Sequence, residues 1–215
     1  GLLSAPNENG ARPTLGFIPM GTGNSFLRDF GGHPIESLLA GKRRPCDVMR
    51  LTHKNGVLHF INILSLGFAA DVAALRNRFF ARFGELGYVL AVLGKVAFLR
   101  PQTIPLRIDG GAENASPVTF ISINNTRFTG GKMMMAPKAD PSDGYADFIR
   151  VAPMGRLQLL RAFPRIFNGT HLDLPTVTSR RVRSIEFNVD HELNCQIDGE
   201  SVKLQPTRMD VLHNA

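Results

Sequence analysis

Apolar and polar positions follow a strand-like pattern through most of the second half of the chain. From Pro101 onward, short runs rich in Val, Ile, Phe and Leu are separated by Gly, Pro, Asn or Asp, which favour turns. Seven of these runs predict strands: 103–109, 118–125, 145–152, 180–189, 193–199, 201–206 and 208–213. Strands in this number and at this spacing indicate a β-sandwich or a barrel.

Two stretches show instead the three- and four-residue spacing of a helix. In residues 70–99 one apolar stripe recurs at this spacing and includes Phe79, Phe83, Leu86 and Leu90. Residues 154–169 predict a second helix, which interrupts the strands. Before these helices, two β-rich runs at 46–52 and 57–68 flank Asn55-Gly56, a dipeptide that favours hairpins.

The first 44 residues have a mixed character. The apolar run 15–19 predicts a strand, and a small-residue loop from Gly21 to Ser25 follows it. Residues 25–32 predict a short helix with Ser25 as N-cap and Gly31-Gly32 as its end, and residues 34–45 predict another. The pattern therefore predicts an α/β piece followed by an antiparallel β domain with helical inserts.

Charge and cysteine content narrow the classes of partner and site. The 215 residues include 25 basic and 18 acidic side chains, a formal charge of +7, which favours anionic partners. The two cysteines, Cys46 and Cys195, lie far apart and show no zinc-site spacing. The most apolar stretches, 60–75 and 88–99, are too short and too interrupted by charge to span a bilayer. We expect a cytoplasmic protein with reduced thiols.

The loop Gly21-Thr22-Gly23-Asn24-Ser25 has the composition of a phosphate-binding turn. It begins like the dinucleotide fingerprint, but Phe26 stands where the third glycine belongs. It is not a P-loop either, because no Gly-Lys pair in the chain is followed by Ser or Thr. Glycines before a helix still let main-chain N–H groups approach an anion. A plain strand-to-helix turn remains equally compatible with the residues.

Two acidic turns are candidate sites of chemistry. Asp198-Gly199-Glu200 separates two predicted strands and is first of all a hairpin signal, although it also places two carboxylates at a tight turn. Asp140, Asp143 and Asp147 cluster around a second turn. Oxygen-rich turns suit Mg²⁺ or Ca²⁺, and the alternative is a turn capped by Asp side chains.

The order of these motifs resembles the diacylglycerol kinase-like lipid kinases, a family that includes bacterial lipid kinases, ceramide kinases and sphingosine kinases. The resemblance covers nearly the whole chain, through segments such as "IPMGTGNSF", "PCDVMRL", "NILSLGFAADV", "NNTRFTGGKMMMAPKADPSDGYADF" and "IDGE". It implies an α/β nucleotide-binding domain and a β-sandwich domain with ATP in the cleft between them. The resulting boundaries are residues 1–44, residues 45–205 and a final strand at 206–215 that returns to the first domain.

The resemblance also implies roles for individual residues. Gly21, Thr22, Gly23 and Asn24, followed by Ser25, match the family's second nucleotide loop, which lines the ATP phosphates. Asp198 and Glu200 match the carboxylates of the catalytic cleft, with Glu200 as the candidate base that activates the lipid hydroxyl. For Mg²⁺, Asp47 matches an acid of the metal-linked network. Asp143, with the carbonyls of Asp140 and Tyr145, matches a structural metal site of bacterial members.

Three departures from the family pattern qualify these roles. Many members have Asp where this chain has Ser25, which removes one carboxylate from the metal network. Sphingosine kinases have an acid where this chain has Ala73, so a neutral lipid such as diacylglycerol is the expected substrate. The family's Gly-Gly-Asp-Gly-Thr motif is absent, so we expect that this chain lacks most of the nucleotide-binding domain and is inactive alone.

Two other functions stay open at this point. An NAD kinase-like enzyme shares the distant architecture, and a non-catalytic β-sandwich that binds a lipid or a partner needs no upstream motif. For the lipid kinase, peripheral contact with an anionic membrane is expected, and Phe79 and Phe80 with the neighbouring arginines are the candidate contacts. A homodimer is compatible with this hypothesis, and no nucleic-acid partner is expected.

Overall fold

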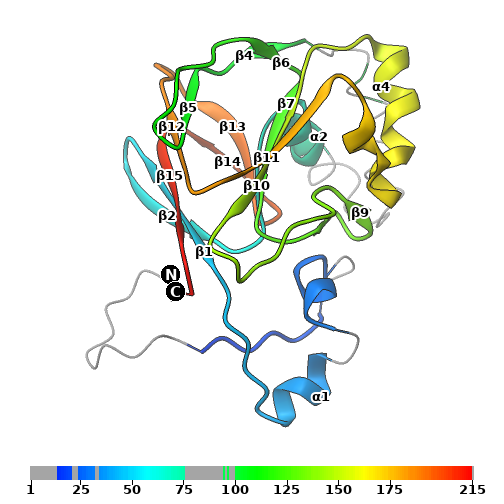
Figure 1. Ribbon diagram of the computed structural model, residues 1–215, viewed down its shortest axis with the longest axis vertical. Coiled ribbons are helices and arrows are strands. Elements are labelled where there is room, and N and C mark those ends of the chain that lie inside the picture. Colours follow the sequence, from blue (N-terminus) through cyan, green and yellow to red (C-terminus); the bar gives the residue numbers. More distant parts are fainter. Residues whose placement is uncertain are drawn as a thin grey trace.

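The computed structural model describes residues 14–20, 24–31, 34–75, 94, 96 and 100–214. Two antiparallel sheets dominate it (Figure 1). The five-stranded sheet has the order β2 (Gly56–Phe60), β1 (Val48–His53), β15 (Pro206–Leu212), β12 (Ser184–Phe187) and β5 (Leu106–Ile108). The six-stranded sheet has the order β11 (Val177–Val182), β10 (Ala146–Val151), β7 (Phe120–Asn124), β3 (Ile63–Gly67), β13 (Leu193–Ile197) and β14 (Glu200–Leu204). The expected β-sandwich is confirmed.

The central strands β10, β7 and β3 of the six-stranded sheet are buried on both faces. On its inner face, Ile121 and Phe148 join the core shared with the five-stranded sheet. On its outer face, Phe120 and Ile149 pack in a second apolar cluster. Since side chains alternate between the two faces of a strand, double burial explains why β7 and β10 are almost continuously apolar.

Helices cover the outer face of this sheet. They are α2 (Phe68–Leu75), α4 (Arg156–Ala162), η5 (Phe163–Asn168) and η6 (Thr170–Asp173), the last two being 3₁₀ helices. The predicted helix at 154–169 is therefore two elements, because Pro164 lies in the first turn of η5 and cannot continue the α-helical bonding. Short pairs β4 (Gln102–Thr103) with β6 (Pro117–Val118), and β8 (Phe128–Thr129) with β9 (Met133–Met134), complete the described strands.

One glycine is required where β3 passes into α2. Gly67 has φ +77°, and a Cβ atom there would lie 3.0 Å from the carbonyl oxygen of Thr119. The apolar run 57–68 thus forms two strands, which belong to different sheets and are separated by Ile61-Asn62. The second strand, β3, ends at Gly67, and any residue with a Cβ atom would be strained there. The hairpin before it is confirmed, with Lys54 and Asn55 between the paired residues His53 and Gly56.

The N-terminal part lies below the sandwich in Figure 1. It contains η2 (Phe26–Phe30), a 3₁₀ helix, and α1 (Pro34–Leu39), so both short helices are confirmed. The strand predicted at 15–19 is wrong: residues 14–20 adopt no regular secondary structure. A strand needs a neighbour to bond with, and no described strand pairs with this segment. The domain division between residues 44 and 45 stays a prediction.

The last strand corrects the expectation that residues 206–215 return to the first domain. β15 lies in the middle of the five-stranded sheet, between β1 and β12. Its residue Met209 is fully buried between Leu51 and Ile185, which are likewise 0% exposed. The alternation of apolar residues in this strand matches the sandwich core, which fixes its place there.

Candidate functional site

The acidic turn near the C-terminus is a two-residue hairpin. β13 and β14 pair antiparallel, with Ile197 opposite Glu200 and Asp198-Gly199 between them. Asp198 has φ +48° and Gly199 has φ +98°, the positive values that this kind of turn requires at both positions. The hairpin predicted from Asp-Gly is confirmed.

The carboxylate of Asp198 is bound by the main chain of another loop. It accepts hydrogen bonds from the N–H groups of Ile61, Asn62 and Ile63, each at 2.9 Å. Asp198 as a whole is exposed, but the atoms packed around its carboxyl raise the pKa of that group by desolvation, and the three donors oppose this rise. Because both oxygens are engaged in these bonds, Asp198 is placed to hold the turn against residues 61–63.

Glu200 has a different environment. It is the first residue of β14, it is exposed, and its carboxylate makes no hydrogen bond or ion pair to any residue that the structure describes. A carboxylate without partners is available to accept a proton from a substrate hydroxyl. Its assignment as the base stays a prediction.

Asp47, the residue just before β1, is fully buried and its carboxylate bonds to two other segments of the chain. Its Oδ2 accepts from the N–H of Gly144 at 2.7 Å, and its Oδ1 accepts from the N–H of Asn214 at 2.8 Å. The Nδ1 atom of His213 also lies 2.8 Å from Oδ1. The carboxylate therefore joins the start of β1 to the acidic turn at 140–144 and to the residues that follow β15.

Asn125 connects Asp47 with the loop that Asp198 holds. Its Nδ2 donates to the carbonyl oxygens of Asp47 at 2.9 Å and of Ile61 at 2.8 Å. Next to it, the hydroxyl of Thr126 donates to the side chain of Asn62. The segment "NNTRF" is part of the family resemblance, but the sequence alone assigned no role to Asn125 or Thr126. Polar residues directly after an apolar strand were the signal that could have marked them as part of the site.

The described part of the glycine loop is attached to the same region. The hydroxyl of Ser25 accepts from the N–H of Gly131 at 2.7 Å. Ser25 is at the N-cap position of η2, as expected, but its side chain makes no capping bond. Asp29, which sequence reasoning missed, binds both the main-chain N–H and the guanidinium of Arg127. Asn24 has φ +45°, while Gly21, Thr22 and Gly23 lie outside the described residues.

A basic cavity of about 720 Å³ lies beside this network, between the N-terminal part and the sandwich. Phe17, Phe26, Cys46, Ile61 and Asn214 line it, together with the consecutive cations Lys42, Arg43 and Arg44. Its size is within the range of small-molecule sites. Burial, and then the charge of Asp47, raise the pKa of the Cys46 thiol to about 11, so this thiol is neutral. Because three cations line the cavity and the thiol carries no charge, the cavity favours an anionic ligand.

The second acidic turn is held by arginines. Asp143 accepts from the N–H of Tyr145 at 3.0 Å and forms an ion pair with Arg181. The guanidinium carbons of Arg181 and Arg183 lie 4.2 and 4.6 Å from the centre of the Tyr145 ring. Asp140 accepts from the N–H and the hydroxyl of Ser142. The turn is thus capped by its own side chains, which was the alternative to a metal site.

The fit of this turn to Mg²⁺ is limited. Within the described ranges, no three Asp, Glu, His or Cys side chains gather closely enough to hold a metal ion. Arg181 already takes the position beside Asp143 that a cation would take, so metal binding requires this ion pair to open. Nearby Asp147 is buried, and burial together with the charge of Asp143 raises its pKa to about 6.

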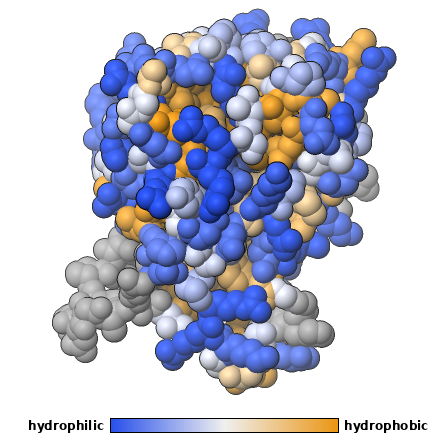
Figure 2. Space-filling view, in the orientation of Figure 1, coloured by the Kyte–Doolittle hydropathy of each residue, from blue (hydrophilic) through white to orange (hydrophobic). Residues whose placement is uncertain are grey.

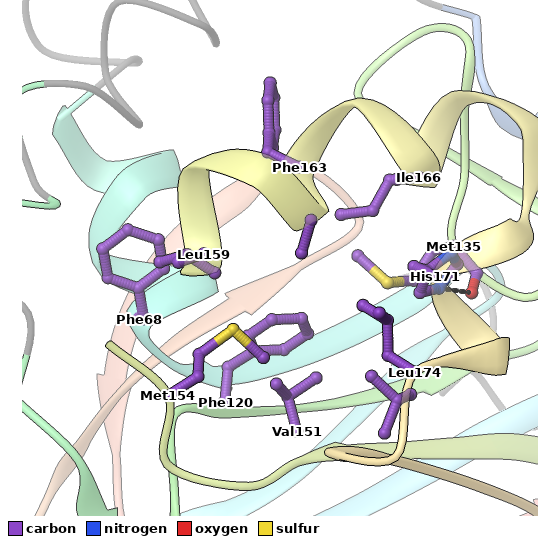
Figure 3. Close-up of a pocket in the computed structure, with 12 residues that line it drawn as sticks. Phe68, Phe120, Met135, Val151, Met154, Leu159, Phe163, Ile166, His171 and Leu174 are labelled. Atoms are coloured by element: carbon purple, nitrogen blue, oxygen red, sulfur yellow. Dashed lines mark hydrogen bonds between the residues drawn. The ribbon is translucent and has the colours of Figure 1, made fainter. Parts of the chain in front are cut away.

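An apolar pocket lies on the helix side of the six-stranded sheet (Figure 3). Phe68, Phe120, Val151 and Met154 lie opposite Leu159 and Ile166, and Phe163 also contributes to the lining. His171 is its polar side chain: it is buried, its Nε2 lies 3.0 Å from the carbonyl oxygen of Met135, and burial lowers its pKa. The free volume is about 40 Å³, so a long hydrocarbon chain enters only if α4 or η5 moves outward.

The predicted membrane contacts, Phe79 and Phe80, lie outside the described residues. Among the residues that are described, no helix is both long and apolar enough to cross a bilayer. The predicted residues Asp47 and Asp198 are linked through Asn125 and residues 61–63, and Ser25 bonds to Gly131 in the segment that follows Asn125. The Asp143 turn joins this network through Gly144 and Asp47.

The sequence of this chain is similar to one described protein family and to known lipid kinases. Residues 62–215 match the family described as the YegS C-terminal NAD kinase beta sandwich-like domain. The chain is 33% identical over 193 residues to a diacylglycerol kinase of Mycobacterium tuberculosis, across 86% of this chain and 62% of that relative. It is 28% identical over 204 residues to a diacylglycerol kinase of Bacillus subtilis, across 91% of this chain and 65% of the relative. The chain thus spans less than two thirds of the length of these relatives.

A solved structure of a putative diacylglycerol kinase from Bacillus anthracis has the same fold. It superimposes with a TM-score of 0.72 at 21% identity and covers 94% of this chain and 68% of its own. A likeness at this identity concerns the fold alone. The shared architecture is the sandwich that carries the Asp198 turn and the apolar pocket.

Proposed function

The chain belongs to the diacylglycerol kinase-like lipid kinase family, and from this membership we propose that the protein transfers the γ-phosphoryl group of ATP to a lipid hydroxyl, with diacylglycerol as the preferred substrate. Phosphoryl transfer depends mainly on positioning and on electrostatic stabilisation of the phosphates. The proposal is supported by an exposed carboxylate at Glu200, the main-chain bonds that hold its turn, a basic cavity and an apolar pocket.

Glu200 acts as the base that accepts the proton of the lipid hydroxyl. Its carboxylate is exposed and has no partner among the described residues, which is the state that such a role needs. Asp198 is a positioning residue, because its oxygens are bound by residues 61–63 and fix the turn that presents Glu200.

The phosphates of ATP bind toward the N-terminal part. Lys42, Arg43 and Arg44 line a cavity of sufficient size there, and Ser25 fastens the glycine loop to Gly131 beside it. Mg²⁺ bound with ATP would supply neutralisation of phosphate charge, and it usually needs only one or two protein carboxylates besides the phosphates. Asp143, with the carbonyls of Asp140 and Tyr145, would hold such an ion only after its ion pair with Arg181 opens. Asp47 would act indirectly, because both of its oxygens already accept hydrogen bonds.

One observation favours a lipid over NAD as the phosphoryl acceptor: the pocket of Figure 3 is lined by hydrocarbon and aromatic side chains around a single neutral imidazole. Such a lining suits an acyl chain once α4 or η5 has moved outward to enlarge the pocket, and it gives a polar dinucleotide nothing to bind.

The test is a phosphoryl-transfer assay with labelled ATP and Mg²⁺ on the full-length gene product. Diacylglycerol, ceramide, sphingosine and NAD are offered as acceptors. We expect label in diacylglycerol and its near-complete loss in Glu200→Ala, while Glu192→Ala, another exposed glutamate, keeps the activity. Label in NAD alone overturns the proposed acceptor, and full activity of Glu200→Ala overturns the proposed base.

A further inference from the structure

A second cavity, of about 320 Å³, lies between the two sheets at their open edge, and the proposed reaction does not use it. Its wall includes Ile104, Ile121 and Phe148, none of them more than 2% exposed. Arg150 and Arg180 stand at its rim beside Asp109. The volume is at the lower end of the range for small-molecule sites.

Both arginines are on the inner face of the six-stranded sheet. Arg180 of β11 pairs with Phe148 of β10, and residues directly opposite each other in an antiparallel pair point to the same side. Arg150 lies two residues beyond Phe148 and therefore shares this side. Since Phe148 belongs to the core between the sheets, the two guanidinium groups border that core.

The arginines keep donors available. Arg150 donates from Nη2 to the carbonyls of Ser116 at 3.2 Å and Pro117 at 2.9 Å, which leaves its remaining N–H groups. The nearest carboxylate oxygen to Arg180 is 3.8 Å away, on Asp109, in a pair with about half of the Arg180 side chain exposed. A pair of this length and exposure contributes little. The other oxygen of Asp109 accepts from the main chain of residues 183 and 184.

Apolar residues reach the surface on this face between the sheets, and hydrophilic residues border them (Figure 2). Inward-pointing charge on an edge strand such as β11 also discourages pairing with other chains. That role alone needs no hollow behind the arginines. Here the wall of the hollow combines apolar side chains, among them Ile104, Ile121 and Phe148, with polar ones, and its rim of two arginines and one aspartate is net positive.

We propose that this cavity binds an anionic amphiphile, with its hydrocarbon chain against Ile104, Ile121 and Phe148 and its oxyanion at Arg180 and Arg150. The site is separate from the pocket of Figure 3, which lies on the opposite face of the same sheet. A carboxylate and a phosphate monoester supply the same chemistry, because each presents a charged oxygen pair to a guanidinium group.

The test measures binding of dodecanoate and of dodecyl phosphate to the full chain by titration calorimetry below their micelle concentrations. Monododecanoylglycerol is the neutral amphiphile of equal chain length. We expect one anion site, weakened about tenfold or more by Arg180→Glu, which removes the charge-assisted bonds. Binding of the neutral amphiphile stays unchanged in this variant. A tighter fit of one head group identifies which anion the site prefers.

Two further variants make the result decisive. Ala112→Trp fills the rim from an exposed turn position and should also weaken anion binding. Arg161→Glu makes the same charge change at an exposed site on α4 and should leave it unaltered. The inference is overturned if neither Arg180→Glu nor Ala112→Trp weakens the anions. It is equally overturned if Arg180→Glu weakens the binding of monododecanoylglycerol as much as that of the anions, because the loss would then not concern the charged head group.

Discussion

Asp198 and Ile63 are 135 positions apart and bond to each other twice: the N–H of Asp198 donates to the carbonyl of Ile63 at 3.0 Å, and the N–H of Ile63 donates to Oδ1 of Asp198 at 2.9 Å. Two further donors, from Ile61 and Asn62, complete the set. This reciprocal contact ties the β13–β14 turn to the chain crossing between the two sheets, so the geometry around Glu200 depends on it.

Asp198→Ala should therefore destabilise the fold by about 2–3 kcal/mol, because three N–H groups lose a charged acceptor and a residue with a Cβ atom but no polar side chain must keep a positive φ. Urea unfolding measures this loss. Asp198→Asn is the matched control, since Asn tolerates the same backbone conformation and retains one acceptor, and it should lose less. An Asp198→Ala variant as stable as the wild type would contradict the anchoring role.

Glu200 is expected to behave in the opposite way. Glu200→Gln should leave the free energy of unfolding within about 0.5 kcal/mol of the wild type, because the side chain is exposed and has no partner among the described residues. Lipid kinase activity of the full-length product should fall by about 10²–10⁴, the usual contribution of a general base. Large destabilisation with normal specific activity would reverse the assignment.

Asp47→Asn should cost about 2–4 kcal/mol. The amide group cannot accept from His213, Asn214 and Gly144 together, and a buried donor without an acceptor is expensive. Asp140→Asn, on the turn that packs against Asp47, is the control: this side chain is exposed and should cost less than about 1 kcal/mol. If urea unfolding shows the same loss of stability in both variants, the burial of Asp47 does not account for the cost of Asp47→Asn.

His171 should make stability depend on pH. Burial lowers the pKa of His171 below the ordinary value of 6.5, so the folded state disfavours the protonated ring. Its contribution to stability is complete above about pH 6.5 and is lost as the pH falls through the lowered pKa. Between pH 7 and pH 5 the wild type should lose more stability than His171→Gln, which does not titrate. An NMR titration that gives a pKa above 6.5 would refute this.

Local patterns were sufficient to predict most of the fold. The runs of β7, β10, β13 and β15 carry apolar residues because each contributes to a core. The turn at Asp198-Gly199 and the hairpin next to Asn55-Gly56 have their own residue signals. The strand predicted at 15–19 failed because an apolar run forms a strand only beside a partner. The place of β15 was missed because sheet order depends on contacts between distant segments.

The candidate site was harder to predict from the sequence than the sheets. Asp198 and Asp47 were identified through the family resemblance, but their partners are mostly main-chain N–H groups, which leave no trace in a sequence. Asp29 and Asn125 were missed for a related reason: each bonds to residues at least 64 positions away, so no spacing rule connects them. The local sequence predicted that the hydroxyl of Ser25 caps the helix that follows it. In the structure this hydroxyl accepts a hydrogen bond from the distant N–H of Gly131.

The central position of β15 has a consequence for synthesis of the protein. Because β1 and β12 meet only through this strand, the five-stranded sheet cannot close while residues 206–212 are still inside the ribosome. The sandwich must therefore finish folding after nearly all of the described chain has emerged. Until then the apolar inner faces of both sheets remain accessible to chaperones, and a ribosome that stops some ten codons before Asn214 releases a chain that cannot complete its core.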